Sequence, residues 1–265
     1  QLAPAQMDAW GWRIPFLVGS LMLPFLLLVR RSLQETPEFQ RRREHPSLRT
    51  IYGTVANNLG IIVLGSLMAM MTTVFFYTVT AYTPTYGTSV LNLSPVAAMF
   101  VTLCVGASNF VLLPTMGALS DRIGRTPLLL ICAVIAIATG YPALAWLTSD
   151  PSFSRLLIVT LWLAAVYAGY NGAMIVYLTE IIPASVRTSG FSLAYSIATA
   201  IFGGFTPAIA TYLIERTGNR AAPGIWLTAA AIISLIAVLL IMRHKARSEA
   251  AETKVESAQL GRAST

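Results

Sequence analysis

The chain has 265 residues, of which 55% are hydrophobic and 11% are charged, and its formal net charge is +7. Soluble domains carry roughly 25% charged residues, so this composition excludes an ordinary soluble domain and favours a membrane protein. A basic excess can also indicate nucleic-acid binding, but no basic stretch here is interleaved with base-stacking or groove-reading residues. The excess fits instead the Lys and Arg that membrane proteins keep in cytoplasmic loops.

Seven stretches are long and apolar enough for a helix that crosses a bilayer, which requires about 20 mostly apolar residues. The run from Thr50 to Ser120 has no charged side chain and is too long for one span. A stretch rich in turn formers, Pro84–Pro95, divides this run into two predicted helices. The predicted helices cover residues 11–29, 56–83, 95–118, 127–147, 155–178, 188–214 and 222–242.

Positive residues alternate between successive loops. The loops at 30–50, 119–126 and 179–187 and the tail from Arg243 carry most of the Lys and Arg, which predicts that they are cytoplasmic. An odd number of spans then places residue 1 outside the cytoplasm and residue 265 inside it. The predicted divisions are an external loop and helix at 1–29, a polar cytoplasmic connector at 30–55, a six-helix bundle at 56–243 and a disordered cytoplasmic tail at 244–265.

A compact charged motif, "GALSDRIGR", follows the third predicted helix. It places Asp121, Arg122 and Arg125 between and beside two glycines, Gly117 and Gly124. Gly117 would allow a neighbouring helix to approach, and Gly124 could adopt the positive φ of a tight turn. Asp121 could attract the N-terminal end of a helix or a guanidinium group. The alternative is an ordinary solvated loop.

This motif resembles the loop signature of the major facilitator superfamily, in the copy between helices eight and nine of a twelve-helix transporter. The segments "GWRIPF" at 11–16 and "RRSLQETPEF" at 30–39 are similar to the sixth helix and central loop of the metabolite:proton symporter family. The segments "YTPTYG" at 82–87, "YNGAM" at 170–174 and "LTEIIPASVRTSGFSLAYSIATAIFGG" at 178–204 resemble its citrate–proton symporter branch.

The resemblance extends to about Arg243. It implies an all-α polytopic membrane protein with the C-terminal six-helix bundle of the superfamily plus one preceding helix. On this reading residues 1–29 end with the last helix of the N-terminal bundle, and helices one to five of the same transporter are missing partners. The implied location is a bacterial inner membrane, with several passes and a cytoplasmic C-terminus.

The function implied is proton-coupled uptake of citrate or a related carboxylate by alternating access, with the small carboxylate, the proton and the lipid bilayer as partners. Tricarballylate, a dicarboxylate, shikimate or a betaine remain alternative substrates. A truncated, non-transporting membrane scaffold is an alternative of another class. The sequence offers no nucleophile–base pair and no metal-ligand spacing, and Cys104 and Cys132 suggest neither a disulfide nor a metal site. We therefore expect no enzyme activity and no cofactor.

A second charged cluster, Glu180 and Arg187, brackets a proline-containing turn. The family architecture implies that it lies near Asp121 and Arg125. We predict a cytoplasmic gate in which Asp121 faces the N-terminus of the helix beginning near Thr188, while Glu180 pairs with Arg125 or Arg187. Such pairs would hold helix ends together in one transport state and separate in the other. A static group of surface ion pairs is the alternative.

Polar side chains recur at helical spacing within several predicted spans, which predicts a shared wet lining. Interhelical hydrogen bonding without a ligand is the alternative. No span has a Lys, Arg, Asp, Glu or His near its middle, so the coupling acid and the cations for a carboxylate would come from elsewhere. The candidate substrate contacts are Thr73, Tyr77, Thr80, Asn109, Tyr170, Asn171, Ser192, Tyr195 and Thr199.

Overall fold

The computed structural model describes residues 6, 9–32, 53, 56, 58–183 and 186–263, and all regular secondary structure in these ranges is helical. The chain divides into two compact units, residues 1–48 and 49–265. Among the described residues, seven helical stretches are long and apolar enough to cross a membrane. The predicted all-α, polytopic architecture with seven spans is therefore confirmed.

The first unit contains one such stretch, built from η1 (Gly11–Arg13), α2 (Ile14–Ser20) and α3 (Met22–Ser32). Proline lies in the first turn of α2, where its missing N–H costs no helical hydrogen bond. The predicted helix 11–29 is present and extends three residues further. Most of the predicted connector at 30–55 lies outside the described residues.

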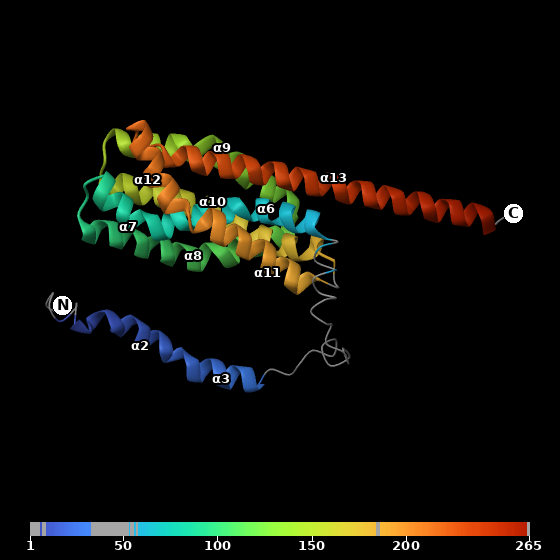
Figure 1. Ribbon diagram of the computed structural model, residues 1–265, viewed down its shortest axis with the longest axis horizontal. Helices are drawn as coiled ribbons and strands as arrows, with labels where there is room; N and C mark the ends of the chain where they lie inside the picture. Colours follow the sequence, from blue (N-terminus) through green and yellow to red (C-terminus); the bar gives the residue numbers. More distant parts are fainter. Residues whose placement is uncertain are drawn as a thin grey trace. The chain divides into compact units, whose positions relative to one another are not determined.

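The second unit is a bundle of long helices, shown in Figure 1. Helix α10 packs against α8 and α9, while α13 packs against α6 and α9. The helices are α6 (Leu59–Tyr77), α7 (Thr83–Thr85), α8 (Pro95–Ile123), α9 (Arg125–Ser149), α10 (Phe153–Ile181), α11 (Arg187–Ile197), α12 (Thr206–Thr217) and α13 (Pro223–Ala263).

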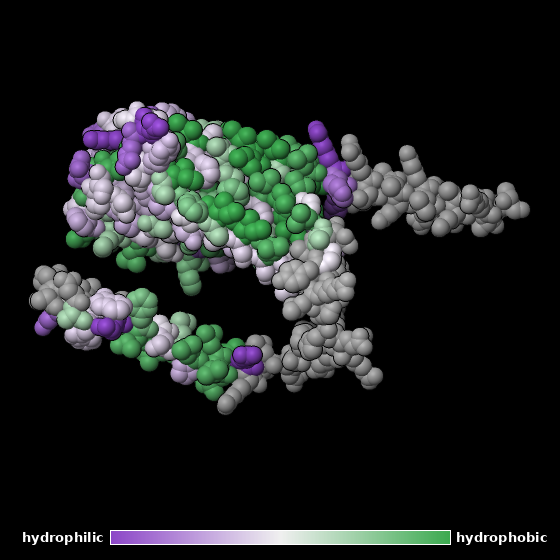
Figure 2. Space-filling view, viewed as in Figure 1, coloured by the Kyte–Doolittle hydropathy of each residue, from purple (hydrophilic) through white to green (hydrophobic). Residues whose placement is uncertain are grey.

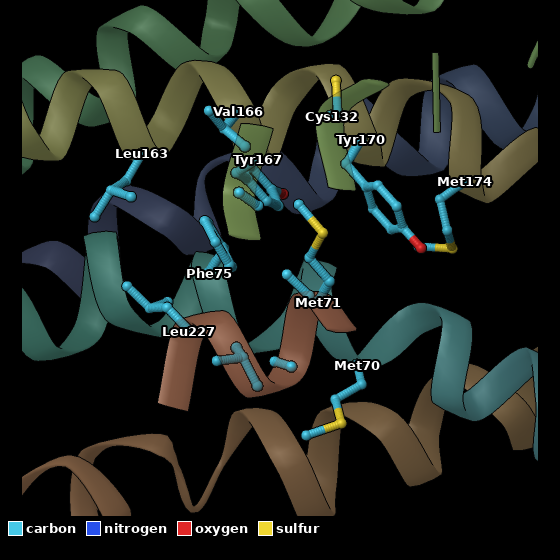
Figure 3. Close-up of a cluster of buried hydrophobic side chains, with 14 of the residues drawn as sticks. Met70, Met71, Phe75, Cys132, Leu163, Val166, Tyr167, Tyr170, Met174 and Leu227 are labelled. Carbon is cyan, nitrogen blue, oxygen red and sulfur yellow. The ribbon is translucent and has the colours of Figure 1, made fainter. Parts of the chain in front are cut away.

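The core of the bundle lies between α6 and α10, which are the most buried of its helices. Figure 3 shows their large side chains meeting there, with Phe75 and Met71 from α6 and Tyr167 and Tyr170 from α10. Leu227 of α13 contributes from a third helix. Thioether and aromatic groups dominate this contact, and methionine fills irregular gaps between helices because it is unbranched and flexible.

Local signals fix several helix boundaries. Ser94 precedes α8 and accepts a hydrogen bond from the backbone N–H of Ala97 at 3.2 Å, with Pro95 at the first helical position. Ser152 caps α10 in the same way through the N–H of Arg155 at 3.3 Å. These side chains satisfy backbone donors that a helix N-terminus leaves without partners.

The prediction of a loop at 84–95 is wrong over most of that range, because the helix that begins with α6 continues to Val90. It does so through two π-helical segments, η2 (Thr78–Tyr82) and η3 (Tyr86–Val90), on either side of α7. Pro84 follows the first of them, and the hydroxyl of Thr83 donates to the carbonyl of Thr78 at 3.0 Å. Threonine hydroxyls that bond to carbonyls of their own helix are among the groups that allow a membrane helix to tolerate proline.

Two other predicted boundaries also differ. The expected turn at 119–126 shrinks to Gly124, whose φ of +93° separates α8 from α9, so Asp121 and Arg122 are helical. The residues predicted as a disordered tail instead continue α13 to Ala263. They are rich in Ala and Glu, which favour helix, and extending an existing helix avoids the cost of nucleation.

The outer surface of the bundle is apolar between its two ends. In Figure 2 the strongly hydrophilic side chains gather at the ends, with hydrophobic residues between them. Large exposed hydrophobic side chains include Phe110 of α8, Trp162 of α10 and Phe205 before α12. A soluble protein rarely exposes such a surface, whereas hydrocarbon chains of a bilayer cover it without cost.

Candidate functional site

Three charged side chains meet where α8, α9 and α10 end or begin; we call them the Arg125 cluster. The guanidinium of Arg125 lies 2.9 Å from the carboxylate of Glu180 and 3.4 Å from that of Asp121. The two acids lie near the C-termini of α10 and α8, and Arg125 begins α9. A negative charge near a helix C-terminus and a positive charge at a helix N-terminus are both unfavourable in the field of the helix dipole. Pairing among the three charges offsets this cost.

The predicted pair between Glu180 and Arg125 is therefore present. Asp121 is predicted to face the N-terminus of the helix that begins at Arg187. In the structure it pairs instead with Arg125, four residues further along the chain. Within the described residues, neither Arg122 nor Arg187 forms an ion pair. Helices α8 and α10 lie very close together at Gly117 and Gly172. A Cβ atom added to Gly172 would lie 2.8 Å from the backbone nitrogen of Gly117.

A cavity of about 290 Å³ adjoins the Arg125 cluster on the side of α6 and α13. Glu180, His244 and Lys245 bring charged or titratable groups to its wall, and Tyr177 and three isoleucines complete it. Sequence patterns could not group these residues, because they come from three helices that are distant along the chain.

The predicted polar face of α6 packs against a break in the helix formed by α11 and α12. This break is the π-helical segment η4 (Ala198–Gly203). The hydroxyl of Thr73 is 3.3 Å from the carbonyl of Ala198, and the Tyr77 ring covers Gly203, where a Cβ would lie 2.9 Å from it. Thr80 donates to its own helix, at the carbonyl of Phe76, and so shares no interhelical bond with them.

Two asparagines are buried with polar atoms that find no partner. Asn109 of α8 is 8% exposed and Asn171 of α10 is 6% exposed, and the side-chain carbonyl oxygen of each has no hydrogen bond. The buried hydroxyl of Thr199 in η4 also has no hydrogen-bond partner. Buried polar atoms are nearly always hydrogen-bonded, so three such atoms on three predicted contact residues indicate places where a bound group or water belongs.

Tyr170 does not line a cavity in this conformation, in contrast with its predicted role. Its ring is fully buried, and its hydroxyl donates to the carbonyl of Met68 at 3.0 Å. Tyr195 of α11 is partly exposed, stacks on Phe191 and lies within electrostatic range of Tyr77. Ser192 is exposed. The predicted contacts thus fall on α6, α8, α10 and the α11–η4 helix, with Tyr170 in the core.

Comparison with known proteins decides the family. The family model described as Major Facilitator Superfamily matches residues 91–263, which is more than half of the chain. The chain belongs to the major facilitator superfamily. Its helical bundle and the signature at 117–125 are therefore those of a superfamily member, as the sequence resemblance implied.

Several named transporters resemble the chain over nearly all of its length. A citrate-proton symporter of Klebsiella pneumoniae is 51% identical over 92% of this chain and 55% of its own length. One of Salmonella typhi is 49% identical over 94% and 57%. A putative proline/betaine transporter of Staphylococcus haemolyticus is 30% identical over 91% and 52%. The chain thus spans about half the length of the curated relatives it matches.

These superfamily relatives are named as transporters and not as enzymes, which agrees with the expectation that the chain has no enzyme activity. Together with the seven apolar helices, they make the chain an integral, multi-pass membrane protein. Sequence reasoning missed Ser234 of α13, which is fully buried and bonds to α6. A single serine in an apolar helix carries no periodic signal that could have singled it out.

Proposed function

We propose that this chain forms part of a proton-coupled transporter for citrate or a closely related carboxylate. The observation that carries the proposal is the level of identity. The two symporters named for citrate are 51% and 49% identical to the chain, whereas the named proline/betaine transporter is 30% identical. Substrate choice depends on side chains inside the bundle, so relatives that share half of all residues are the best guide to it.

We propose further that the chain supplies the C-terminal bundle and one preceding helix, and that five more helices complete the transporter. In the described spans, charged side chains lie only near the helix ends. A polyanion and a proton near the middle of a membrane need a cation and a titratable acid. The relatives' additional length offers the place for both.

The lining of the transport path is assigned here to the uncharged groups of α6, α8, α10 and the α11–η4 helix. Asn109 and Asn171 offer amides with unused hydrogen-bonding capacity, and Thr199 offers a hydroxyl. An amide donates to a carboxylate and accepts from a protonated carboxyl or hydroxyl, which suits a substrate that exists in several protonation states. Tyr77 and Tyr195 offer further hydroxyl donors.

The Arg125 cluster is assigned the role of a gate at the cytoplasmic ends of the helices. Arg125 joins the start of α9 to the end of α10 through Glu180, and its two ion pairs are partly exposed to solvent. Partly exposed pairs break at low cost, which is what a reversible contact between two transport states requires. The matching location is a bacterial inner membrane with the C-terminus in the cytoplasm, because the Arg-rich loops share that side.

Uptake of labelled citrate into proteoliposomes holding the full-length gene product tests this proposal. We expect accumulation with an acidic exterior and loss of accumulation when a protonophore removes the gradient. Excess unlabelled tricarballylate, succinate, shikimate and glycine betaine, tested as competitors, rank the alternative substrates. Strong uptake of one of these without citrate uptake would overturn the citrate assignment, and no uptake of any would favour the scaffold.

A further inference from the structure

A serine of α13 contacts two backbone groups of α6 at once. Ser234 is fully buried, and its hydroxyl oxygen accepts a hydrogen bond from the N–H of Met71 at 2.9 Å. The same hydroxyl donates to the carbonyl of Leu67 at 2.8 Å. In a regular α-helix these two groups, four residues apart, bond to each other. The hydroxyl therefore bridges one rung of the hydrogen-bond ladder of α6.

A second hydroxyl reaches the same turn from another helix. Tyr170 of α10 donates to the carbonyl of Met68, which neighbours the bridged rung. Figure 3 shows Tyr170 and Met71 within the same buried cluster. Two helices thus supply polar groups to one turn of α6, in a region where no water competes and an unpaired group is costly.

A hydroxyl that bonds to both members of one rung holds that turn of the helix against the neighbouring helix. The bridged turn ends at Met71, just before the part of α6 that carries Thr73 and Tyr77. Those two side chains contact η4, with Thr73 at the Ala198 carbonyl and Tyr77 over Gly203. The direction in which α6 leaves the bridged turn therefore sets how these side chains meet η4.

We propose that Ser234 is a positioning residue for transport: its bridge to Leu67 and Met71 sets the path of α6 and thereby places Thr73 and Tyr77 at the transport path. Ser234 itself lies in the core and touches no substrate. The inference rests on the proposed function for its transport readout, but its structural readout is independent of any substrate.

The transport test uses three variants of the full-length protein in proteoliposomes. Ser234→Ala removes both bonds, and the protein still folds because the backbone groups of Leu67 and Met71 can bond to each other in a regular helix. Helix α6 loses this anchor to α13 and changes its path. We expect the KM for citrate to rise by about five- to tenfold, because displacements of about 1 Å at a binding site have effects of this size or larger. Ser234→Thr keeps the hydroxyl and restores most of the lost affinity.

Ser66→Ala provides the matched control. Ser66 is also a buried serine near this turn, but its hydroxyl bonds only within α6, to the carbonyl of Ile62 at 3.0 Å. We expect it to leave KM unchanged. An equal rise in KM for Ser66→Ala and Ser234→Ala, or no rescue by Ser234→Thr, would overturn the proposal, because any lost serine would then have the same effect.

The structural test measures the distance between spin labels at Leu59 and Phe76, two exposed positions on either side of the bridged turn. Cys104 and Cys132, together with any cysteine in the rest of the full-length protein, are first replaced so that only the labelled cysteines remain. We expect Ser234→Ala to shift the distance distribution and Ser66→Ala to leave it in place. An unshifted distribution refutes the positioning role, whatever the protein transports. A shifted distribution without citrate uptake supports the positioning role and counts only against the proposed substrate.

Discussion

Neutralising Glu180 tests the gate most directly. Glu180→Gln removes the shorter of the two pairs made by Arg125, the one that connects α9 to α10, and leaves the pair with Asp121 intact. Opposite charges about 4 Å apart attract by about 1 kcal/mol in water and by about 4 kcal/mol at an effective dielectric constant of 20. Since the side chains of Arg125 and Glu180 are 31% and 49% exposed, solvent screening and lost side-chain freedom reduce this attraction.

We take a net value of about 0.8 kcal/mol, within the range of about 0–1 kcal/mol for exposed pairs. If the pair exists only when the cytoplasmic side is closed, its loss changes the ratio of open to closed states about fourfold. A single cysteine at the exposed Ser192 reports this ratio through its rate of labelling by an impermeant maleimide in inside-out vesicles. We expect Glu180→Gln to raise the labelling rate by about two- to fourfold and high salt to reduce the difference.

Asp150→Asn is the control, because it removes a pair of comparable length, 3.3 Å to Arg155, that joins the end of α9 to the start of α10 at the opposite end of the bundle. We expect this variant to leave the labelling of Ser192→Cys unchanged. Equal labelling rates in Glu180→Gln and the unsubstituted protein would refute the gate and leave the Arg125 cluster a static surface contact.

Three further predictions concern single positions. Asn171→Leu removes an unpartnered buried amide, so we expect unchanged or higher thermal stability together with about tenfold weaker citrate affinity in a transport assay; unchanged affinity would assign Asn171 to packing alone. Gly172→Ala places a Cβ 2.8 Å from the Gly117 backbone, and we expect it to lower the free energy of unfolding by about 1–3 kcal/mol, measured by thermal unfolding. The control Gly106→Ala adds a Cβ in open space and should leave the stability unchanged. Gly124→Ala forces a side chain onto a φ of +93° and should cost about 1–2 kcal/mol, measured in the same way; an unshifted melting temperature would contradict the strain.

The number and placement of the spans could be predicted because charge marks their ends. Arg30, Asp121 and Arg243 each lie within a few residues of a boundary that the structure places at the end of an apolar stretch. The continuation of the second span past Pro84 could not be predicted, because a proline and a glycine normally indicate a turn. Only the tertiary structure shows threonine hydroxyls and π-helical turns that accommodate them.

For the candidate site, the pairing of Glu180 with Arg125 followed from the architecture that the resemblance implied. The unpartnered oxygens of Asn109 and Asn171 agree with the expectation that an amide is hard to satisfy alone in an apolar helix. The burial of Tyr170 could not be read from periodicity, because a face that points to a cavity and one that points to a neighbouring helix have the same spacing.

The helix that begins at Leu59 and continues to Val90 has 32 residues, so it is about 48 Å long, whereas the hydrocarbon layer of a bilayer is about 30 Å thick. A tilt of about 20° takes up only part of that excess. The helix therefore extends beyond the hydrocarbon layer, and near its C-terminal end the rings of Tyr82 and Tyr86 lie 5.6 Å apart at an angle of 33°. Tyr86 is fastened there by a 2.7 Å bond from its hydroxyl to the carbonyl of Arg220. Both rings are buried, so they hold this end of the helix to the segment between α12 and α13 and not to lipid.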